Sequence, residues 1–207
     1  MTDGDIVHVV DDDEAVRHSL HFLLGTAGLR VAAHATAEAF LRVAGEQPVG
    51  CVLTDVRMPG LGGLELQAQL LAGGWPIPVI VMTGHGDVPT AVQALKEGAL
   101  DFLEKPFDEE QLLAAVRRAL AKGQVMRAAH LAASAAASRL ATLTPREREV
   151  LDGLVAGQAS KRIALDLGTS PRTVEVHRMR VMEKLRVRSL PELVRLVQAA
   201  TTAAAPG

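Results

Sequence analysis

The first 122 residues alternate short apolar runs with amphipathic helical segments. The apolar runs have the length of strands buried on both faces, and they lie at Ile6–Val10, Leu29–Ala33, Val49–Leu53, Val79–Met82 and Leu100–Glu104. Between and after them, apolar residues recur at helical spacing over Val16–Ala27, Thr36–Ala44, Leu64–Ala72, Pro89–Gly98 and Asp108–Ala121. This alternation predicts an α/β domain over residues 1–122, a doubly wound five-stranded parallel sheet with helices on both faces.

Residues 141–207 show only helical patterns, which predict an all-α domain of four short helices. Thr144-Pro145-Arg146-Glu147 and Ser189-Leu190-Pro191-Glu192 have the residue types of capping boxes, and Ser170-Pro171 sets an N-cap serine before a proline at the first helical position. A tight turn at Gly168 joins the middle two helices. This is the layout of a helix-turn-helix.

Residues 123–140, between the two domains, are rich in alanine and poor in large apolar residues. Such a segment buries little surface, yet alanine is the strongest helix former. We predict a semi-rigid helical linker, and a disordered tether is the alternative.

Composition narrows the class of protein. The chain has 207 residues, 48% of them hydrophobic, but no apolar run reaches the roughly 20 residues that cross a bilayer. The N-terminus Met-Thr-Asp-Gly-Asp lacks the basic-then-apolar order of a signal peptide. Cys51 is the only cysteine, so the chain forms no internal disulfide. We expect a soluble cytoplasmic protein without a membrane partner.

Charge is distributed unevenly along the chain. Residues 1–122 hold nine basic and 17 acidic side chains, whereas residues 141–207 hold 11 basic and seven acidic ones. This asymmetry supports two separate domains and favours a polyanionic partner for the basic one.

Five polar residues stand where apolar runs end. Asp11 and Asp12 follow the first run, Asp55 the third, Thr83 the fourth, and Lys105 closes the fifth. In an open parallel sheet these strand ends meet at one edge, where ligands bind. Three carboxylates repel one another unless a cation joins them, and hard oxygen ligands favour Mg²⁺. With a hydroxyl and an ammonium beside them, they predict a metal-assisted phosphoryl acceptor.

The motifs around these residues resemble a known family. Four segments resemble motifs of the receiver domain of two-component response regulators. They are Val9-Val10-Asp11-Asp12-Asp13, Leu53-Thr54-Asp55-Val56-Arg57-Met58-Pro59-Gly60, Val81-Met82-Thr83-Gly84 and Glu104-Lys105-Pro106-Phe107. Two further segments resemble the LuxR-type helix-turn-helix. They are Leu143-Thr144-Pro145-Arg146-Glu147-Arg148-Glu149-Val150-Leu151 and Thr173-Val174-Glu175-Val176-His177-Arg178. Together they resemble the NarL/FixJ family, closer to its FixJ branch, over Asp5–Ala199.

The resemblance implies a flavodoxin-like sheet and a role for each site residue. Asp55 corresponds to the phosphoacceptor, and Thr83 and Lys105 to the groups that contact the phosphoryl oxygens. Phe102 takes the place of the aromatic switch residue. The Mg²⁺ ligands are Asp11, Asp12, Asp55 and the backbone carbonyl of Arg57. Asp13 is expected to cap the first helix instead.

The same resemblance implies the partners. A sensor histidine kinase, or a small phosphodonor, phosphorylates Asp55. The chain then forms a homodimer through the face Pro89–Glu104 and binds an operator in double-stranded DNA to regulate transcription. RNA polymerase is a further candidate partner, and masking of the recognition helix by the unphosphorylated receiver is left open.

Helical geometry divides the segment Pro171–Leu185 into two faces. Val174, Val181 and Leu185 should face the core. In the major groove, exposed apolar side chains meet thymine methyls and a glutamate accepts from cytosine N4, while cations contact phosphates. The predicted DNA contacts are Lys161, Ser170, Arg172, Thr173, Glu175, Val176, Arg178, Met179, Arg180 and Lys184.

Two other classes of protein share some of these features. A phosphatase or phosphotransferase with an aspartyl-phosphate intermediate also uses Mg²⁺ and clustered aspartates, but it needs substrate-binding insertions that these short loops lack. A phosphate-independent DNA-binding protein would use the receiver for dimerisation alone, and the intact acidic pair argues against it. We therefore expect a switch and not a turnover enzyme, in which the receiver catalyses only its own phosphorylation and slow dephosphorylation.

Overall fold

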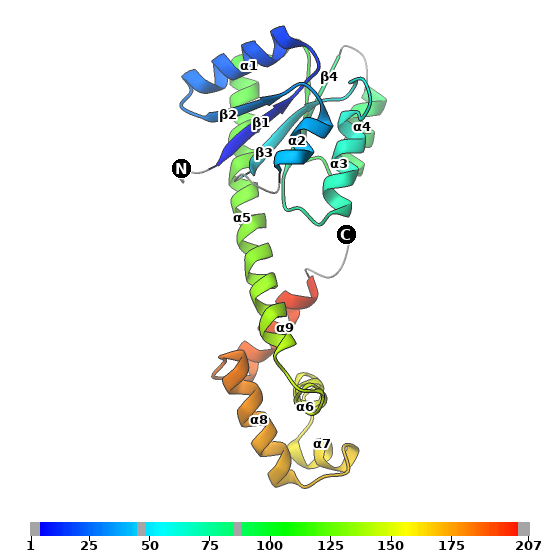
Figure 1. Cartoon of the computed structure of the whole chain (residues 1–207), viewed down its shortest axis with the longest axis vertical. Coiled ribbons are helices and arrows are strands. Elements are labelled where there is room, and N and C mark those ends of the chain that lie inside the picture. Colours follow the sequence, from blue (N-terminus) through cyan, green and yellow to red (C-terminus); the bar gives the residue numbers. More distant parts are fainter. Residues whose placement is uncertain (1–4, 45–48, 85–87, 203–207) are drawn as a thin grey trace. The chain divides into compact units, whose positions relative to one another are not determined.

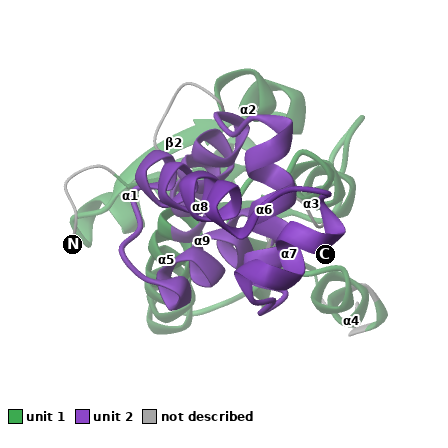
Figure 2. Cartoon of the chain, turned by 90° about the horizontal axis from the view of Figure 1, so that it is seen from below, with its two compact units in different colours: residues 1–128, 207 green, residues 129–206 purple. Residues whose placement is uncertain are grey.

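The computed structural model describes residues 5–44, 49–84 and 88–202. They form two compact units, of which unit 1 ends at Ala128 and unit 2 runs from Ala129 (Figures 1 and 2). In the described part of the chain, no helix is both long and apolar enough to cross a membrane.

Unit 1 is built on a five-stranded parallel sheet, as predicted. The strand order is β2-β1-β3-β4-β5, and neighbouring strands are parallel throughout. Each strand lies within about two residues of its predicted position. The elements are β1 (Ile6–Val10), α1 (Glu14–Thr26), β2 (Arg30–His34), α2 (Ala37–Val43), β3 (Val49–Asp55), α3 (Gly63–Ala72), β4 (Val79–Thr83), α4 (Val88–Lys96), β5 (Asp101–Glu104) and α5 (Glu109–Ala141).

Helices cover both faces of this sheet (Figure 1). On one face, α1 and α5 pack against the strands through Leu24 and Val116. On the other, α2, α3 and α4 do so through side chains such as Phe40 and Leu66. Because alternate residues of each buried strand point to opposite faces, the continuous apolar runs of β1 and β4 contribute side chains to the hydrophobic cores on both faces of the sheet.

Two predicted helix caps of unit 1 are confirmed. The Asp13 side chain accepts hydrogen bonds from the amides of Ala15 and Val16 at the start of α1, and Thr36 Oγ1 accepts from the amide of Ala39 at the start of α2. An N-cap oxygen satisfies amides that have no partner within the helix. The third aspartate of the acidic run is therefore used to begin a helix.

A pair of histidines lies inside the sheet of unit 1. His8 is fully buried on β1, its Nδ1 lies 2.9 Å from His34 Nε2, and the two rings stack with centroids 5.2 Å apart. Phe40 packs against both rings. Burial, followed by the neighbouring His34, lowers the pKa of His8 to about 4. The imidazole is therefore neutral near pH 7.

Helix α5 continues through the whole segment expected as a linker. Its early part packs on unit 1: a Cβ on Gly123 would collide with the Gly50 carbonyl oxygen, and Gln124 and Arg127 both bind the Asp5 carboxylate. The packing of unit 1 thus extends to Ala128, past the boundary expected at residue 122.

Unit 2 contains the four predicted helices, together with the end of α5. They are α6 (Pro145–Val155), α7 (Ser160–Asp166), α8 (Pro171–Leu185) and α9 (Leu190–Thr202). The capping box of Thr144 and Glu147 is confirmed, as is the Ser170 cap of α8. Before α9, Ser189 caps the Glu192 amide, whereas the Glu192 carboxylate accepts from the amide of Arg188. The core is formed by residues such as Leu151, Ile163 and Leu193.

The buried histidine makes the stability of unit 1 depend on pH. Between about pH 6.5 and 4 the unfolded chain protonates His8 while the folded chain does not, so stability is fully present above pH 6.5 and is lost as the pH falls. We expect a loss of about 2 kcal/mol in the unfolding free energy between pH 7.5 and pH 5. Urea unfolding followed by the fluorescence of the single tryptophan, Trp75, measures it.

A matched pair of variants isolates this effect from other titrations. His8→Leu should reduce the dependence between pH 7.5 and 5, because only the partly buried His34, whose pKa burial also lowers, remains. His18→Gln, at an exposed site on α1, should keep the wild-type slope. Equal slopes in His8→Leu and wild type would contradict the assignment.

Candidate functional site

The candidate site of unit 1 lies where the strands end at the carboxyl edge of the sheet. Asp55 is the last residue of β3 and Thr83 the last of β4, while Asp11 and Lys105 directly follow β1 and β5. The Lys105 ammonium nitrogen lies 2.9 Å from Asp11 Oδ2 and 2.5 Å from Asp55 Oδ1. The structure thus brings together residues 94 and 50 positions apart in the chain.

The ammonium of Lys105 compensates the negative charge of this site. Burial by itself would lower the pKa of Lys105, but hydrogen bonds and charge attraction from Asp11 and Asp55 outweigh burial and raise the pKa above its ordinary value. Asp11 is almost completely buried. Two carboxylates so close to each other, one of them out of reach of water, require a cation between them.

The loop after Asp55 is hydrogen-bonded to the Asp55 carboxylate. The backbone amide of Arg57 donates to Asp55 Oδ2 over 2.7 Å. Further along, α3 begins so close to β3 that a Cβ on Gly63 would collide with the Asp55 carbonyl oxygen. Gly63 was not among the predicted site residues, although the pair Gly62-Gly63 after the loop is a signal of a close backbone approach.

Asp12 lies apart from the other two carboxylates. Its side chain is exposed, and in the described ranges no three acidic, histidine or cysteine side chains are placed to hold a metal ion together. Lys105 provides the positive charge between Asp11 and Asp55. The donor set at this edge, the three carboxylates and the Arg57 carbonyl, consists of the hard oxygens that Mg²⁺ prefers.

Thr83 and Phe102 lie on the same face of neighbouring strands. In the β4–β5 register Val81 pairs with Phe102 and Thr83 with Glu104, so both side chains point to the face covered by α4. Thr83 is buried, whereas Phe102 is 38% exposed. The backbone of Lys105 also donates to the Thr83 carbonyl over 2.7 Å. Thr83, at the carboxyl edge of the sheet, therefore shares a face with an aromatic side chain that reaches the surface.

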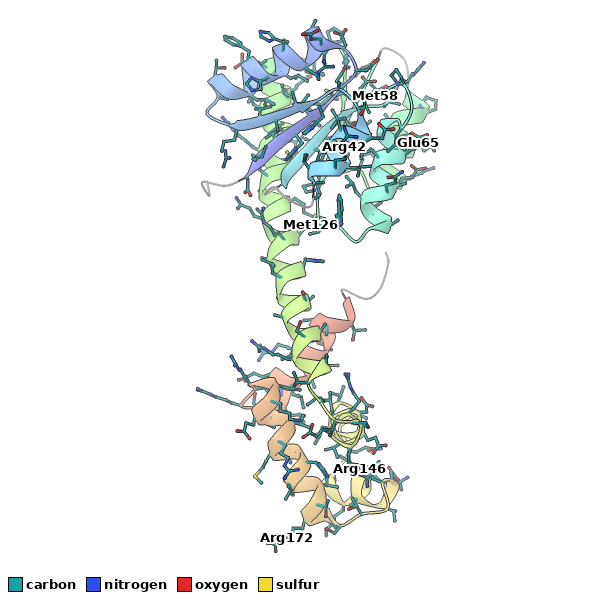
Figure 3. The ribbon with its side chains drawn as sticks, in the orientation of Figure 1. Arg42, Met58, Glu65, Met126, Arg146 and Arg172 are labelled. Carbon is teal, nitrogen blue, oxygen red and sulfur yellow. The ribbon has the colours of Figure 1, made fainter. Side chains whose placement is uncertain are left out.

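Helix α8 of unit 2 has the two faces that its sequence predicts. Val174, Val181 and Leu185 are fully buried, whereas Met179 is 64% and Val176 37% exposed. Arg172, labelled in Figure 3, lies in the first turn of the helix. Apolar side chains left exposed on one helix face are typical of a surface that binds something else.

Some predicted DNA contacts have partners inside unit 2. Ser170 Oγ accepts from the amide of Thr173 and lies 2.9 Å from its hydroxyl. Glu175 accepts from Ser160 Oγ over 2.5 Å and lies 3.8 Å from Arg178. These contacts join α7 to α8 and order the first turn of α8, while Lys161, Arg172, Val176, Met179 and Arg180 remain exposed.

Lys184 forms an ion pair with a buried glutamate. Its ammonium lies 2.6 Å from Glu147 Oε2, and the same oxygen accepts from the amide of Thr144 over 2.8 Å. The hydrogen bond from Lys184, then that from Thr144, lowers the pKa of Glu147 to about 2. Lys184 thereby ties α8 to the start of α6, a role that the sequence analysis missed because the two residues are 37 positions apart.

Two family models match the chain. Response regulator receiver domains match residues 7–117, and the luxR family of bacterial regulatory proteins matches residues 141–197. The transcriptional regulatory protein FixJ of Azorhizobium caulinodans is 55% identical over 199 residues, which are 96% of this chain and 94% of the relative. The response regulator protein TmoT of Ectopseudomonas mendocina is 42% identical over 93% of this chain and 88% of its own length.

Solved structures show the same similarity. The response regulator StyR has a TM-score of 0.76 at 43% identity, covering 94% of this chain and 98% of its own. Full-length FixJ from B. japonicum has a TM-score of 0.58 at 48% identity, covering 98% and 99%.

The ion pair between Lys184 and Glu147 should stabilise unit 2. Lys184→Met keeps the aliphatic stem and removes the charge, and we expect it to cost about 1–3 kcal/mol, because a buried carboxylate loses a donor. Hydrogen exchange of the α6 and α8 amides in the full chain measures the loss. Lys161→Met, at an exposed site of α7, is the control and should leave exchange unchanged.

The pH dependence of stability gives a second test of the ion pair between Lys184 and Glu147. The lowered pKa of Glu147 contributes stability that is present above about pH 4.5 and is lost as the pH falls toward 2. In Lys184→Met this acid-side loss should shrink and the carboxyl should titrate at a higher pH by NMR. An unchanged Glu147 titration would contradict the pairing.

Proposed function

Since this chain belongs to the response regulators that join a receiver domain to a luxR-type DNA-binding domain, we propose that phosphorylation of Asp55 controls its binding to an operator. Like its FixJ relatives, it is a transcriptional regulator of the two-component type. The observation that carries the proposal is the Lys105 ammonium held between Asp11 and Asp55. DNA binding implies a place in the cytoplasm, where a sensor histidine kinase delivers the phosphoryl group.

Asp55 is suited to act as the nucleophile. An Asp55 carboxylate oxygen forms a bond to phosphorus, while the bond from phosphorus to the donor, a phosphohistidine nitrogen or the acyl oxygen of acetyl phosphate, breaks and its electrons leave with the donor. The amide of Arg57 holds the other oxygen of Asp55 in place. Lys105 is already within contact of Asp55 and can follow the new negative charge.

The residues at this edge also fit Mg²⁺. Asp11, Asp12, Asp55 and the carbonyl of Arg57 would hold the ion, which neutralises charge on the transferred phosphoryl oxygens. Asp12 is available for this role because it makes no hydrogen bond or ion pair with the described residues. Asp11 contributes a carboxylate that is already ordered by Lys105 and by the amide of Asp13.

Phosphorylation of Asp55 would change the surface of unit 1 through movements of Thr83 and Phe102. A phosphoryl group on Asp55 offers acceptors to the Thr83 hydroxyl, whose present hydrogen bond to the Gly84 carbonyl is long at 3.4 Å. Movement of Thr83 opens room on the face that it shares with Phe102. Phe102 then turns inward, and the surface around α4 and β5 changes shape.

That surface is a suitable dimer interface. Within the predicted face Pro89–Glu104, Val92, Leu95 and Phe102 are each about 40% exposed. Apolar side chains at this spacing on α4 and β5 form a patch that a second copy would cover. A dimer places two α8 helices on half-sites of one operator. RNA polymerase is the further partner that a promoter-bound dimer would meet.

On DNA, exposed Val176 and Met179 would contact base edges in the major groove, and Lys161, Arg172 and Arg180 would contact phosphates. Ser170, Thr173, Glu175 and Arg178 shape the start of α8 and are proposed to contact DNA from there. Lys184 is the least accessible of the predicted contacts, because Glu147 already binds its ammonium.

Replacement of the nucleophile tests the phosphorylation step. We expect ³²P-labelled acetyl phosphate with Mg²⁺ to label the wild-type chain and not Asp55→Asn, since the amide is a poor nucleophile. A chelator should abolish labelling of the wild type. Asp13→Asn, which keeps a helix cap outside the site, is the control and should be labelled normally. Equal labelling of Asp55→Asn would refute the assignment.

Variants of α8 test the recognition surface. With phosphorylated protein and duplexes selected from a random pool, Met179→Ala should weaken specific binding about tenfold and leave non-specific binding unchanged. Arg172→Ala should instead weaken binding to all sequences and make the slope of log K against log salt about 0.9 shallower.

Leu165→Ala is the matched control for this experiment. Leu165 is an exposed apolar residue of α7, outside the proposed DNA contacts, and its replacement should alter neither quantity. Fluorescence anisotropy at several salt concentrations gives affinity and slope together. A Met179→Ala protein with wild-type sequence preference would exclude α8 as the reading helix.

A further inference from the structure

Unit 1 contains a cavity formed by residues near the amino ends of β4 and β5, at the opposite edge of the sheet from Asp55. Its volume is about 220 Å³. The wall is mostly apolar and comes from four parts of the chain: the end of α3, the segment before β4, the turn before β5, and α5. The lining includes Leu70, Trp75, Ile77, Ala99, Leu100 and, labelled in Figure 3, Met126.

A buried amide group borders this cavity. Gln67 is only 1% exposed, and its Nε2 donates to the Ala94 carbonyl over 3.2 Å, but its Oε1 has no partner among the described residues. Gln67 and Gly98 both line the cavity, and Gln67 Nε2 lies 3.9 Å from the position of a Cβ on Gly98. A buried acceptor without a donor is unfavourable, and a ligand with an N–H or O–H group would satisfy it.

The cavity also has a cation. Lys122 of α5 lines it and is exposed, so its stem can cover the apolar wall while the ammonium stays near water. Within the described ranges the Lys122 side chain makes no ion pair or hydrogen bond. No acidic side chain lines the cavity. The charge complementarity of the site therefore favours an anionic ligand.

Size limits the ligand further. The volume is below the roughly 300–1,000 Å³ of pockets for drug-sized ligands, so only a fragment-sized body fits. We propose that this cavity binds a small aromatic carboxylate that also carries a hydroxyl or N–H group, with the ring among the apolar side chains, the donor on Gln67 Oε1 and the carboxylate toward Lys122. This proposal goes beyond phosphorylation and DNA binding, and its test uses neither.

The single tryptophan provides the readout. The indole N–H of Trp75 gives one resonance in ¹⁵N spectra of the full chain, and the probe is 4-hydroxybenzoate. We expect saturable shifts of this resonance and of the amides lining the cavity, with a Kd on the order of 1 mM or tighter. Benzoate, which lacks the donor, and phenol, which lacks the carboxylate, should each bind at least about threefold more weakly.

Two variants assign the polar contacts. Gln67→Leu keeps the volume and removes the acceptor, so 4-hydroxybenzoate should lose its advantage over benzoate while benzoate still binds. Lys122→Met should remove the advantage of 4-hydroxybenzoate over phenol. Lys96→Met, on α4 and outside the cavity lining, should bind all three like wild type. A melting curve of each variant verifies that it is folded.

The following results would overturn the proposal. One is the absence of saturable shifts at the cavity in wild type with up to about 10 mM 4-hydroxybenzoate. Another is binding that maps to other residues, and a third is retention of both preferences in folded Gln67→Leu and Lys122→Met. Because no phosphodonor or DNA is present, these failures are distinct from a failure of the function proposed for Asp55.

Discussion

The repulsion between the buried Asp11 carboxylate and the nearby Asp55 carboxylate is the constraint on which the receiver unit depends. The Lys105 ammonium relieves it, and in doing so joins the ends of β1, β3 and β5 at one edge of the sheet. Because two negative groups share one cation, a change of charge on either alters what the cation binds. A phosphoryl group on Asp55 would add negative charge at this point, and Mg²⁺ would add positive charge.

The same residue links the chemistry to the outer surface. Lys105 follows β5 directly, and its backbone is bonded to the Thr83 carbonyl at the end of β4. Phe102, three residues earlier on the edge strand, is partly exposed beside the apolar residues of α4. A displacement of Lys105 or Thr83 therefore acts on β5, whose partly exposed Phe102 belongs to the proposed dimer face, and on its buried neighbour β4.

Residue periodicity was enough to predict the strands of the sheet, the four helices of the second unit and both faces of α8, because each depends on local burial. The strand ends also placed Asp11, Asp55, Thr83 and Lys105 at one edge. Pairing between distant residues could not be predicted in this way. Lys184 was expected to contact phosphate, and nothing in its helix shows that Glu147 lies beside it. The stacked pair of His8 and His34 likewise depends on the register of two strands.

Ion pairs, one of them long-range and others within one helix, also change the set of charges that the DNA-binding unit leaves unpaired. By composition this unit is only moderately basic, but several of its acidic groups are neutralised internally, among them Glu147 by Lys184, Glu149 by Arg146 and Asp166 by Arg162. Arg172 and Arg180 on α8 have no such partner in the described part of the chain. These two arginines therefore leave positive charge on the helix that also carries the exposed Val176 and Met179. On DNA, attraction to phosphates and contact with base edges would then come from the same helix, which is the condition for a helix that both binds DNA and reads its sequence.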